Sequence, residues 1–517
     1  MPDVVLFHDE YVSKINRFIS VIAICLISLL FILDYTVVSA AIPYIVGDLG
    51  SSIDEGTYTI TFFAIGSGIM MIAAGWLSKR FGTIKILSLS FLFFSIFSFL
   101  CVTSITILQL VIFRFFQGVS VGCIVPLAQS LFAYIYKDDH HNRVIAMSVY
   151  STIVMVSPAL GPVVGGYFCT EYSWKWSFYL NIPIGILCAI AVWISLKYIN
   201  KSNTKEKCDF VSIILLLIGT VSLQLFFDKG EQWNWLSSNR ERICLLIFFL
   251  CYCYLIIWSF LIKKPLLQLH LFKIKQFTLS IILTVLIYSL YIGSIIIVPM
   301  WLQDYLHYNA FWAGVVIAPL GIFSLVTPLF GHFIKKIGFF IPIAAGLFFI
   351  FISCLYSRYF TSCVDLYHII ASKFIFGVGI AIIIMPLLTM PVSALPEHLL
   401  SDGLGIFHFI RAMAGAIGAS VYVTLFNRRI SHQHVNIISN FNDFNINSVE
   451  YINKIKNLII NDNSLEIANR FINQQASTIA FNEINYLMAC IVVIVFFISL
   501  FTLRKKAINE YPALRRK

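Results

Sequence analysis

Four ionisable side chains lie deep within long apolar stretches of this chain, where a charge is costly to bury. They are Asp34, Arg114, Lys373 and Arg411. A charged side chain costs about 2.5–3.5 kcal/mol at the centre of a membrane helix, so such residues usually face a cavity or one another. An acid beside a cation in such a place can take up and release a proton during a working cycle.

The composition indicates that these side chains are carried by membrane-spanning helices. Of the 517 residues, 59% are hydrophobic and only 12% are charged, and the mean hydropathy is +0.88. Soluble proteins carry about 25% charged residues. A helix needs about 20 apolar residues to cross the hydrocarbon core. Fourteen stretches meet this length, near 18–39, 57–77, 84–103, 106–130, 144–168, 178–198, 210–228, 242–262, 277–302, 312–333, 340–356, 365–390, 403–427 and 485–504.

The lysines and arginines gather on one side of these spans. If the N-terminus is cytosolic, most of them fall in cytosolic segments and few in the short outside loops, which predicts that both termini are cytosolic. The net charge of +11 then reflects topology, and we expect no nucleic-acid partner. Most of the 12 cysteines lie within spans and lack histidine or carboxylate company, so we expect no metal site and no cofactor.

An internal repeat predicts the domain organisation. Gly75–Gly82 recurs as Gly331–Gly338, about 256 residues later, and Pro43 matches Pro299 at the same offset. We therefore expect an all-α polytopic membrane protein with two parallel six-helix halves, 1–209 and 263–517. Two further spans at 210–262 are inserted between them, and a long periplasmic loop is expected at 428–484. Parallel repeats around a central path are typical of secondary transporters.

A cluster of prolines and glycines interrupts the apolar stretch at 144–168. Its residues are Pro158, Gly161, Pro162, Gly165 and Gly166. Prolines kink a helix, and glycines let its backbone approach a neighbouring helix closely. The cluster predicts a transporter helix that bends and packs backbone to backbone, although an ordinary kink is the alternative because both residues are common in membrane spans.

Depth along the spans relates the four buried charges. Asp34 lies ~24 Å from the inner start of the first span, and Arg114 lies ~13 Å below the outer surface, so the two meet if their faces agree. A proton-coupling role and a permanent ion pair that only orders the helices are both open. Lys373 reaches a depth similar to that of Arg114 from the second half, and Arg411 lies nearer the cytosol.

The chain resembles the EmrB/QacA-type drug:proton antiporters, the fourteen-span branch of the major facilitator superfamily. The motifs that carry the resemblance are Leu33–Val38 with Ala41–Pro43, Gly75–Lys85, Arg114–Gly118, Gly161–Gly166, Trp174–Gly185, Trp301–Gln303 with Trp312–Gly314, and Ser401–Gly403 leading into Arg411. They cover nearly the whole chain. The resemblance implies proton-coupled export of hydrophobic toxic compounds across the bacterial inner membrane by alternating access. It also implies a periplasmic adaptor protein and an outer-membrane channel, with 428–484 as the candidate adaptor contact.

The candidate site residues fall into three groups. Asp34 and Arg114 are assigned to proton coupling. The candidates for the substrate path are Tyr35, Gln117, Lys373 and Arg411, and those for gating are Gly75, Lys79, Arg80, Gly82 and the proline–glycine cluster. Lys79 departs from the usual loop motif, which has an aspartate there, so an ion-paired latch at this loop is in doubt.

Two other functions are weighed against multidrug export. A dedicated exporter of one metabolite, such as a siderophore or a fatty acid, would have the same motifs. An integral-membrane enzyme such as an acyltransferase would need a polar catalytic cluster, for which His140 and His141 are weak candidates. The chain has no Walker A sequence, so it is not itself an ATP-driven pump.

Overall fold

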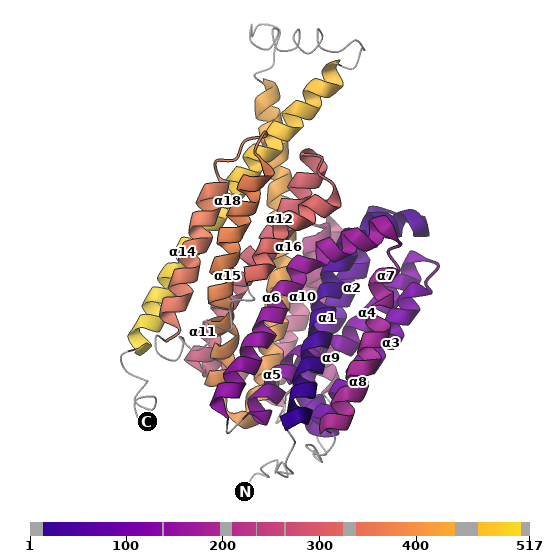
Figure 1. Cartoon of the computed structure of the whole chain (residues 1–517), viewed down its shortest axis with the longest axis vertical. Coiled ribbons are helices and arrows are strands. Elements are labelled where there is room, and N and C mark those ends of the chain that lie inside the picture. Colours follow the sequence, from indigo (N-terminus) through magenta and orange to yellow (C-terminus); the bar gives the residue numbers. More distant parts are fainter. Residues whose placement is uncertain are drawn as a thin grey trace.

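Helices make up almost all of the described chain (Figure 1). The computed structural model describes residues 14–136, 139–196, 209–233, 235–262, 265–323, 338–439 and 464–507. The first half comprises α1 (Lys14–Leu49), α2 (Ile53–Phe81), α3 (Thr83–Val102), α4 (Ile107–Val121), α5 (Ile124–Ile135), α6 (His140–Glu171), α7 (Trp176–Tyr179) and α8 (Asn181–Leu196). The inserted pair is α9 (Phe210–Lys229) and α10 (Asn239–Leu261), with the 3-10 turn η1 (Trp235–Ser237) between them. The second half comprises η2 (Leu269–Lys273), α11 (Lys275–Met300), η3 (Trp301–Tyr305), α12 (Ala310–Ile322), α14 (Phe340–Ser357), α15 (Leu366–Ala394), η5 (Glu397–Leu399), α16 (Leu400–Ser439) and α18 (Ser464–Ala507).

These helices follow the expected spans. The described residues contain 12 helices long and apolar enough to cross a membrane, or up to 13 if the bent pair within α6 counts as one. The expected span at 312–333 begins as α12, and its remainder lies outside the described residues, as does the repeat motif at 331–337. α1 begins and α18 ends at the same end of the bundle (Figure 1), here called the terminal end.

The two halves share a local backbone feature that the repeat predicts. Gly82 ends α2 with a φ of 91°, and Gly338, just before α14, has a φ of 77°. These values are in the left-handed region that side chains with a Cβ rarely adopt. The glycines therefore allow the same left-handed backbone conformation just before α3 and just before α14.

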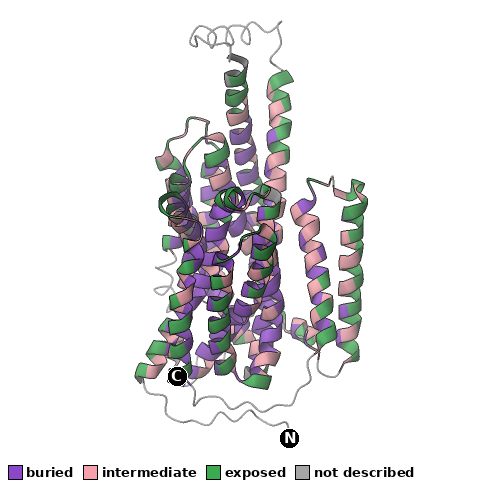
Figure 2. Ribbon diagram, turned by 90° about the vertical axis from the view of Figure 1, so that its right-hand side faces the viewer, coloured by how far each residue is buried: buried purple, intermediate pink, exposed green. Residues whose placement is uncertain are grey.

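The halves meet mainly along two helix pairs. α2 packs against α16, and α6 packs against α12. The inserted α9 packs on α10 and also touches both α2 and α16. Figure 2 shows buried residues gathered along the axis of the main bundle, whereas two helices stand to one side and one of these is exposed or half-buried along most of its length. α10 is the least buried span, with only 11% of its apolar window buried, so most of its surface is free to contact lipid.

The proline–glycine cluster produces the predicted bend and close approach. Ile145–Pro158 and Val163–Glu171 form the two arms of α6, at 47° to each other. A Cβ on Gly161 would come within 1.8 Å of Thr36 Oγ1, and one on Gly165 within 2.8 Å of the Val37 carbonyl oxygen. Pro158 and Gly166 are buried, and Pro162 lies between the two arms. α6 therefore packs with its backbone against α1, beside Asp34.

The described parts of the segment 428–484, which are 428–439 and 464–484, are helical. α16 continues to Ser439 and α18 begins at Ser464, so both run beyond the other helices at the end opposite the terminal end (Figure 1). Polar contacts join the two extensions: Gln433 donates to Glu483 at 2.7 Å, and Arg429 lies 3.6 Å from the same carboxylate. The composition of the sequence does not predict the continuation of α16, because the polar surface of this extension resembles a loop in composition.

Candidate functional site

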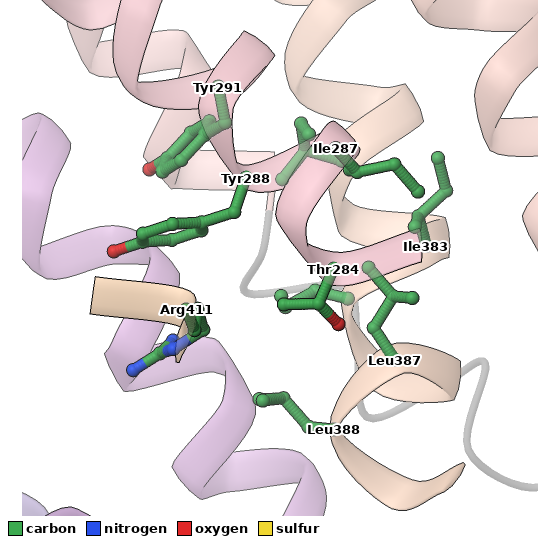
Figure 3. A pocket seen from close by; sticks show the side chains of 10 residues that line it. Thr284, Ile287, Tyr288, Tyr291, Ile383, Leu387, Leu388 and Arg411 are labelled. Atoms are coloured by element: carbon green, nitrogen blue, oxygen red, sulfur yellow. The ribbon is translucent and has the colours of Figure 1, made fainter. Parts of the chain in front are cut away.

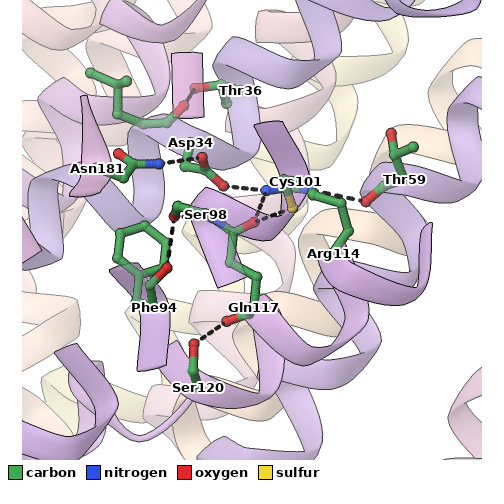
Figure 4. Close-up of polar contacts among 11 residues, drawn as sticks. Asp34, Thr36, Thr59, Phe94, Ser98, Cys101, Arg114, Gln117, Ser120 and Asn181 are labelled. Atoms are coloured by element: carbon green, nitrogen blue, oxygen red, sulfur yellow. Dashed lines mark hydrogen bonds and ion pairs between the residues drawn. The ribbon is translucent and has the colours of Figure 1, made fainter. Parts of the chain in front are cut away.

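The first half holds a buried ion pair between α1 and α4. Arg114 and Asp34 are 0% and 1% exposed, and Arg114 Nη1 donates to Asp34 Oδ2 (Figure 4). Arg114 Nη1 also donates to Gln117 Oε1 at 2.7 Å, and Arg114 Nε donates to the Thr59 carbonyl oxygen at 3.3 Å. The sequence prediction that Asp34 and Arg114 meet is therefore confirmed as geometry.

Amide side chains hold both partners in position. Asn181, at the start of α8, donates from Nδ2 to Asp34 Oδ1 at 2.8 Å, while Gln117 donates from Nε2 to Ser98 Oγ at 2.8 Å (Figure 4). Hydrogen bonds to charged groups are stronger than those between neutral groups. Gln117, a candidate for the substrate path, is fully buried between Arg114 and α3.

The cluster can respond to a change of charge. The Arg114 guanidinium lies 4.0 Å from the Phe63 ring centroid, and its Nη2 has no hydrogen-bond partner among the described residues. Removing one partner of a buried ion pair costs about 3–5 kcal/mol because the other charge is left uncompensated. Protonation of Asp34 removes such a partner without any mutation, so a single proton is expected to alter the packing of α1, α4 and α8.

An ion pair joins the halves at the terminal end. The expectation that Lys79 makes an ion-paired latch doubtful at this loop is therefore corrected. Lys79, in the last turn of α2, pairs with Asp402 near the start of α16, and Gln268 Nε2 donates to Asp402 at 2.6 Å. The Gly75–Lys85 motif thus supplies the cation of this ion pair, and α16 supplies the acid. Gly75 makes room for this contact, since a Cβ there would lie 1.9 Å from Asp402 Oδ1. Arg80 is exposed at the end of α2.

A second carboxylate joins the halves at the opposite end, and the sequence reading missed it. Asp228, near the end of α9, accepts hydrogen bonds from Thr61 of α2 at 2.7 Å and from Ser420 of α16 at 2.7 Å. Gln224 of its own helix donates at 2.8 Å. Asp228 is the last residue of the span expected at 210–228. Its helical spacing from Gln224, four residues earlier, was the available signal.

Arg411 lies between these two contacts, where it lines a narrow pocket in the second half. The pocket is formed by α11, α15 and α16, and Figure 3 shows Arg411 beside Tyr288 and Thr284. The guanidinium lies 5.0 Å from the Tyr288 ring centroid. His408, three residues before Arg411 on α16, forms a hydrogen bond between its Nε2 and Gln129 Oε1 of α5 at 2.9 Å. Arg411 therefore lies on the face of α16 that meets the first half.

The structure separates the remaining substrate-path candidates. Tyr35 lies within electrostatic range of Arg114, Asp228 and Tyr288, which places it between the two halves. Lys373 lies elsewhere: it is 1% exposed, donates to Ser294 Oγ at 3.2 Å, and does not line the pocket. The described residues contain no group of three or more His, Cys, Asp or Glu side chains that could hold a metal ion.

Comparisons with known proteins agree on a family. Residues 24–419 match the Major Facilitator Superfamily. The chain is 33% identical over 476 residues to the multidrug export protein EmrB of Escherichia coli (strain K12), a match that covers 91% of this chain and 92% of that protein. It is 31% identical over 455 residues to the fatty acid resistance protein FarB of Neisseria gonorrhoeae, covering 88% and 89%.

Solved structures share the fold. The human organic anion transporter MFSD10 (TETRAN) superposes with a TM-score of 0.57 at 12% identity, covering 94% of this chain and all of that one. A bacterial homologue of the human lysosomal transporter Spinster, in an inward-facing and occupied conformation, gives 0.56 at 14% identity, with 95% and 98% covered. The sequence relatives are transporters, which sets the acyltransferase alternative aside. This chain belongs to the Major Facilitator Superfamily, as a multi-pass membrane transporter of the EmrB type.

Proposed function

We propose that this protein exports hydrophobic toxic compounds across the bacterial inner membrane in exchange for protons. The observation that carries the proposal is the fully buried Asp34–Arg114 pair in a chain with the fold of a secondary transporter. The similarity to EmrB over most of both chains supports the choice of substrates.

Asp34 is the proposed proton carrier. Its protonation leaves the Arg114 charge without a counter-ion, at a cost of about 3–5 kcal/mol. A free energy of about 5.5 kcal/mol takes a two-state equilibrium from 1:99 to 99:1, so a cost of this size shifts the population of two conformations strongly. Asn181 and Gln117 hold the pair in place while it is formed.

The two polar contacts between α2 and α16 are the proposed gates. The ion pair between Lys79 and Asp402 closes the terminal end. At the opposite end, Asp228 accepts hydrogen bonds from both Thr61 and Ser420 and so closes that end. Alternating access requires the halves to separate at one end at a time. Each contact therefore has to break in a different phase of the cycle.

Export of a single metabolite is the second candidate. The similarity to FarB, whose name refers to fatty acid resistance, favours a fatty acid over a siderophore as that metabolite. A periplasmic adaptor and an outer-membrane channel are further proposed partners, with the extensions of α16 and α18 as the contact surface. Val435 and Phe471 on these extensions are 64% and 50% exposed, which supports a docking role.

Inverted membrane vesicles with an acid interior test the proposal. Lipophilic cations and antibiotics are added while a dye reports the internal pH. We expect the gradient to fall on addition of substrate in vesicles that contain the protein, and not in vesicles that lack it. A gradient that no compound in the panel disturbs, beyond the effect on empty vesicles, contradicts multidrug exchange.

A further inference from the structure

Lys373 occupies in the second half the position that Arg114 occupies in the first. Gly118, four residues after Arg114, packs so closely that a Cβ on it would lie 2.2 Å from the Phe63 carbonyl oxygen. Gly377, four residues after Lys373, packs in the same way, because a Cβ on it would lie 2.4 Å from a carbonyl oxygen of α12. That carbonyl belongs to the residue 256 positions after Phe63, which is the offset of the repeat. The two buried cations are therefore equivalent in the two halves.

The acid of the first pair has no counterpart in the second half. At the same offset of 256 residues, Leu290 of α11 takes the place of Asp34, and it is buried. Lys373 is 1% exposed, and it donates a hydrogen bond to Ser294 Oγ at 3.2 Å. The described part of the chain brings no carboxylate within ion-pair distance of its amine. The second half thus holds a buried basic group without an acid.

The surroundings of the Lys373 amine favour its neutral form. The Phe376 and Phe481 ring centroids lie 5.7 and 5.8 Å from Nζ, near the limit of about 6 Å for a cation–π contact. Cys354 of α14 is the titratable group within electrostatic range among the described residues. An ammonium has three donors, and a buried cation without a counter-ion is strongly disfavoured. Lysine, unlike arginine, can lose its proton and so avoid this cost.

We propose that Lys373 is a second proton-binding site of the transport cycle, a neutral amine in this conformation and an ammonium in the conformation open at the end opposite the terminal end. Protonation of Asp34 leaves the Arg114 cation without a counter-ion, and protonation of Lys373 creates a cation that has none. One proton therefore disfavours the present packing in each half. This inference deepens the proposed function and rests on it for the role of Lys373 in transport.

A cluster of buried hydroxyls lies beside Lys373, toward the end opposite the terminal end. Ser372 precedes Lys373 on α15, and its hydroxyl bonds with those of Ser353 and Ser357 of α14. All three serines are 0% exposed, and Ser357 is the last residue of α14. Lys373 lies ~10 Å along α15 from the start of that helix at the same end. Because hydroxyls both donate and accept hydrogen bonds, they can pass a proton from this end to the amine.

Distances between spin labels count the linked protons without a substrate or a gradient. The labels are attached to the purified full-length protein at cysteines introduced at Glu55 and Ser431, after the exposed cysteines are replaced by serine. If the open conformation binds one more proton than the closed one, the ratio of open to closed falls up to about tenfold per pH unit. Between pH 7 and 10 we expect this fall in wild type and a loss of one proton's worth of it in Lys373→Met. Lys275→Met, which removes an exposed lysine at the start of α11, should behave as wild type.

The melting temperature is a second readout, and it shows that the variant folds. Lys373→Met keeps a side chain of similar length and removes the amine, so it should be at least as stable as wild type at pH 7. A lysine of the unfolded chain is protonated below about pH 10.4. A neutral Lys373 then means that the unfolded chain binds one more proton than the folded one, so stability rises with pH. We expect the melting temperature of wild type to rise relative to that of Lys373→Met between pH 7 and 10.

Two results overturn the inference. A constant difference in melting temperature over this range means that the amine stays protonated in the folded protein. A difference that changes with pH, together with equal slopes of the distance populations in wild type and Lys373→Met, makes Lys373 a neutral structural residue with no part in the cycle.

The failure of this inference is distinguishable from that of the proposed function. A slope that depends on Lys373, together with no proton exchange in wild-type vesicles, supports the second proton site as a property of the conformational change and contradicts proton-coupled export. Exchange in the vesicles, together with equal slopes, supports the export proposal and overturns the second proton site.

Discussion

Asp228 is expected to hold the halves together at the end opposite the terminal end, and Asp228→Ala tests this. The variant removes the acceptor for both Thr61 and Ser420, which belong to different halves. Hydrogen bonds between membrane helices contribute about 0.6 kcal/mol on average and at most about 1.7 kcal/mol. Two such bonds amount to about 1–3 kcal/mol, which corresponds to a roughly 5- to 150-fold shift toward the conformation open at that end.

Distances between spin labels measure this shift directly. The labels are attached to cysteines introduced at Glu55 and Ser431, which are exposed near this end of α2 and α16, after the native exposed cysteines are replaced by serine. We expect Asp228→Ala to raise the population of long distances. Asp228→Asn, which keeps one acceptor oxygen, should lie between that variant and wild type. An Asp228→Ala distribution identical to that of wild type refutes the reasoning.

Two further predictions concern the helix contacts around the site. Gly161→Val should destabilise the protein strongly, since even a Cβ at this position meets Thr36 Oγ1 at 1.8 Å. The check is the melting temperature, which should fall well below that of a variant with a substitution on the exposed face of α10. Lys79→Asp should open the terminal end, and the exchanged pair with Asp402→Lys should restore the contact. Recovery of transport in the exchanged pair checks this, and equal activity of the single and double variants contradicts it.

Much of the fold could be predicted because apolar length and proline–glycine patterns act locally. The spans, the bend of α6 and the turn at Gly82 each depend on a short stretch of sequence. The helical extension of α16 could not be predicted in this way, because a polar helix outside the membrane has the composition of a loop.

Residues of the candidate site could be predicted only where their charge and their depth along a span identified them. Asp34 and Arg114 were matched by counting residues along two spans. The partner of Lys79 could not be predicted in this way. Asp402 lies 323 residues away in sequence, and only the packing of α2 on α16 brings it near Lys79. Asp228 was missed for the same reason, since its hydrogen-bond donors come from helices in both halves.

The most direct test of the central claim separates the charge of Asp34 from its structural role. Asp34→Asn alone leaves Arg114 buried and unpaired, so the Asp34→Asn/Arg114→Gln double variant is measured beside it in the acid-interior vesicles, with Asp48→Asn as a control on the exposed part of α1. We predict that the double variant folds, reaches the membrane and no longer exchanges protons for substrate, while Asp48→Asn behaves as wild type. Substrate-driven proton release by the double variant at the wild-type rate would contradict the assignment of Asp34 as the proton carrier.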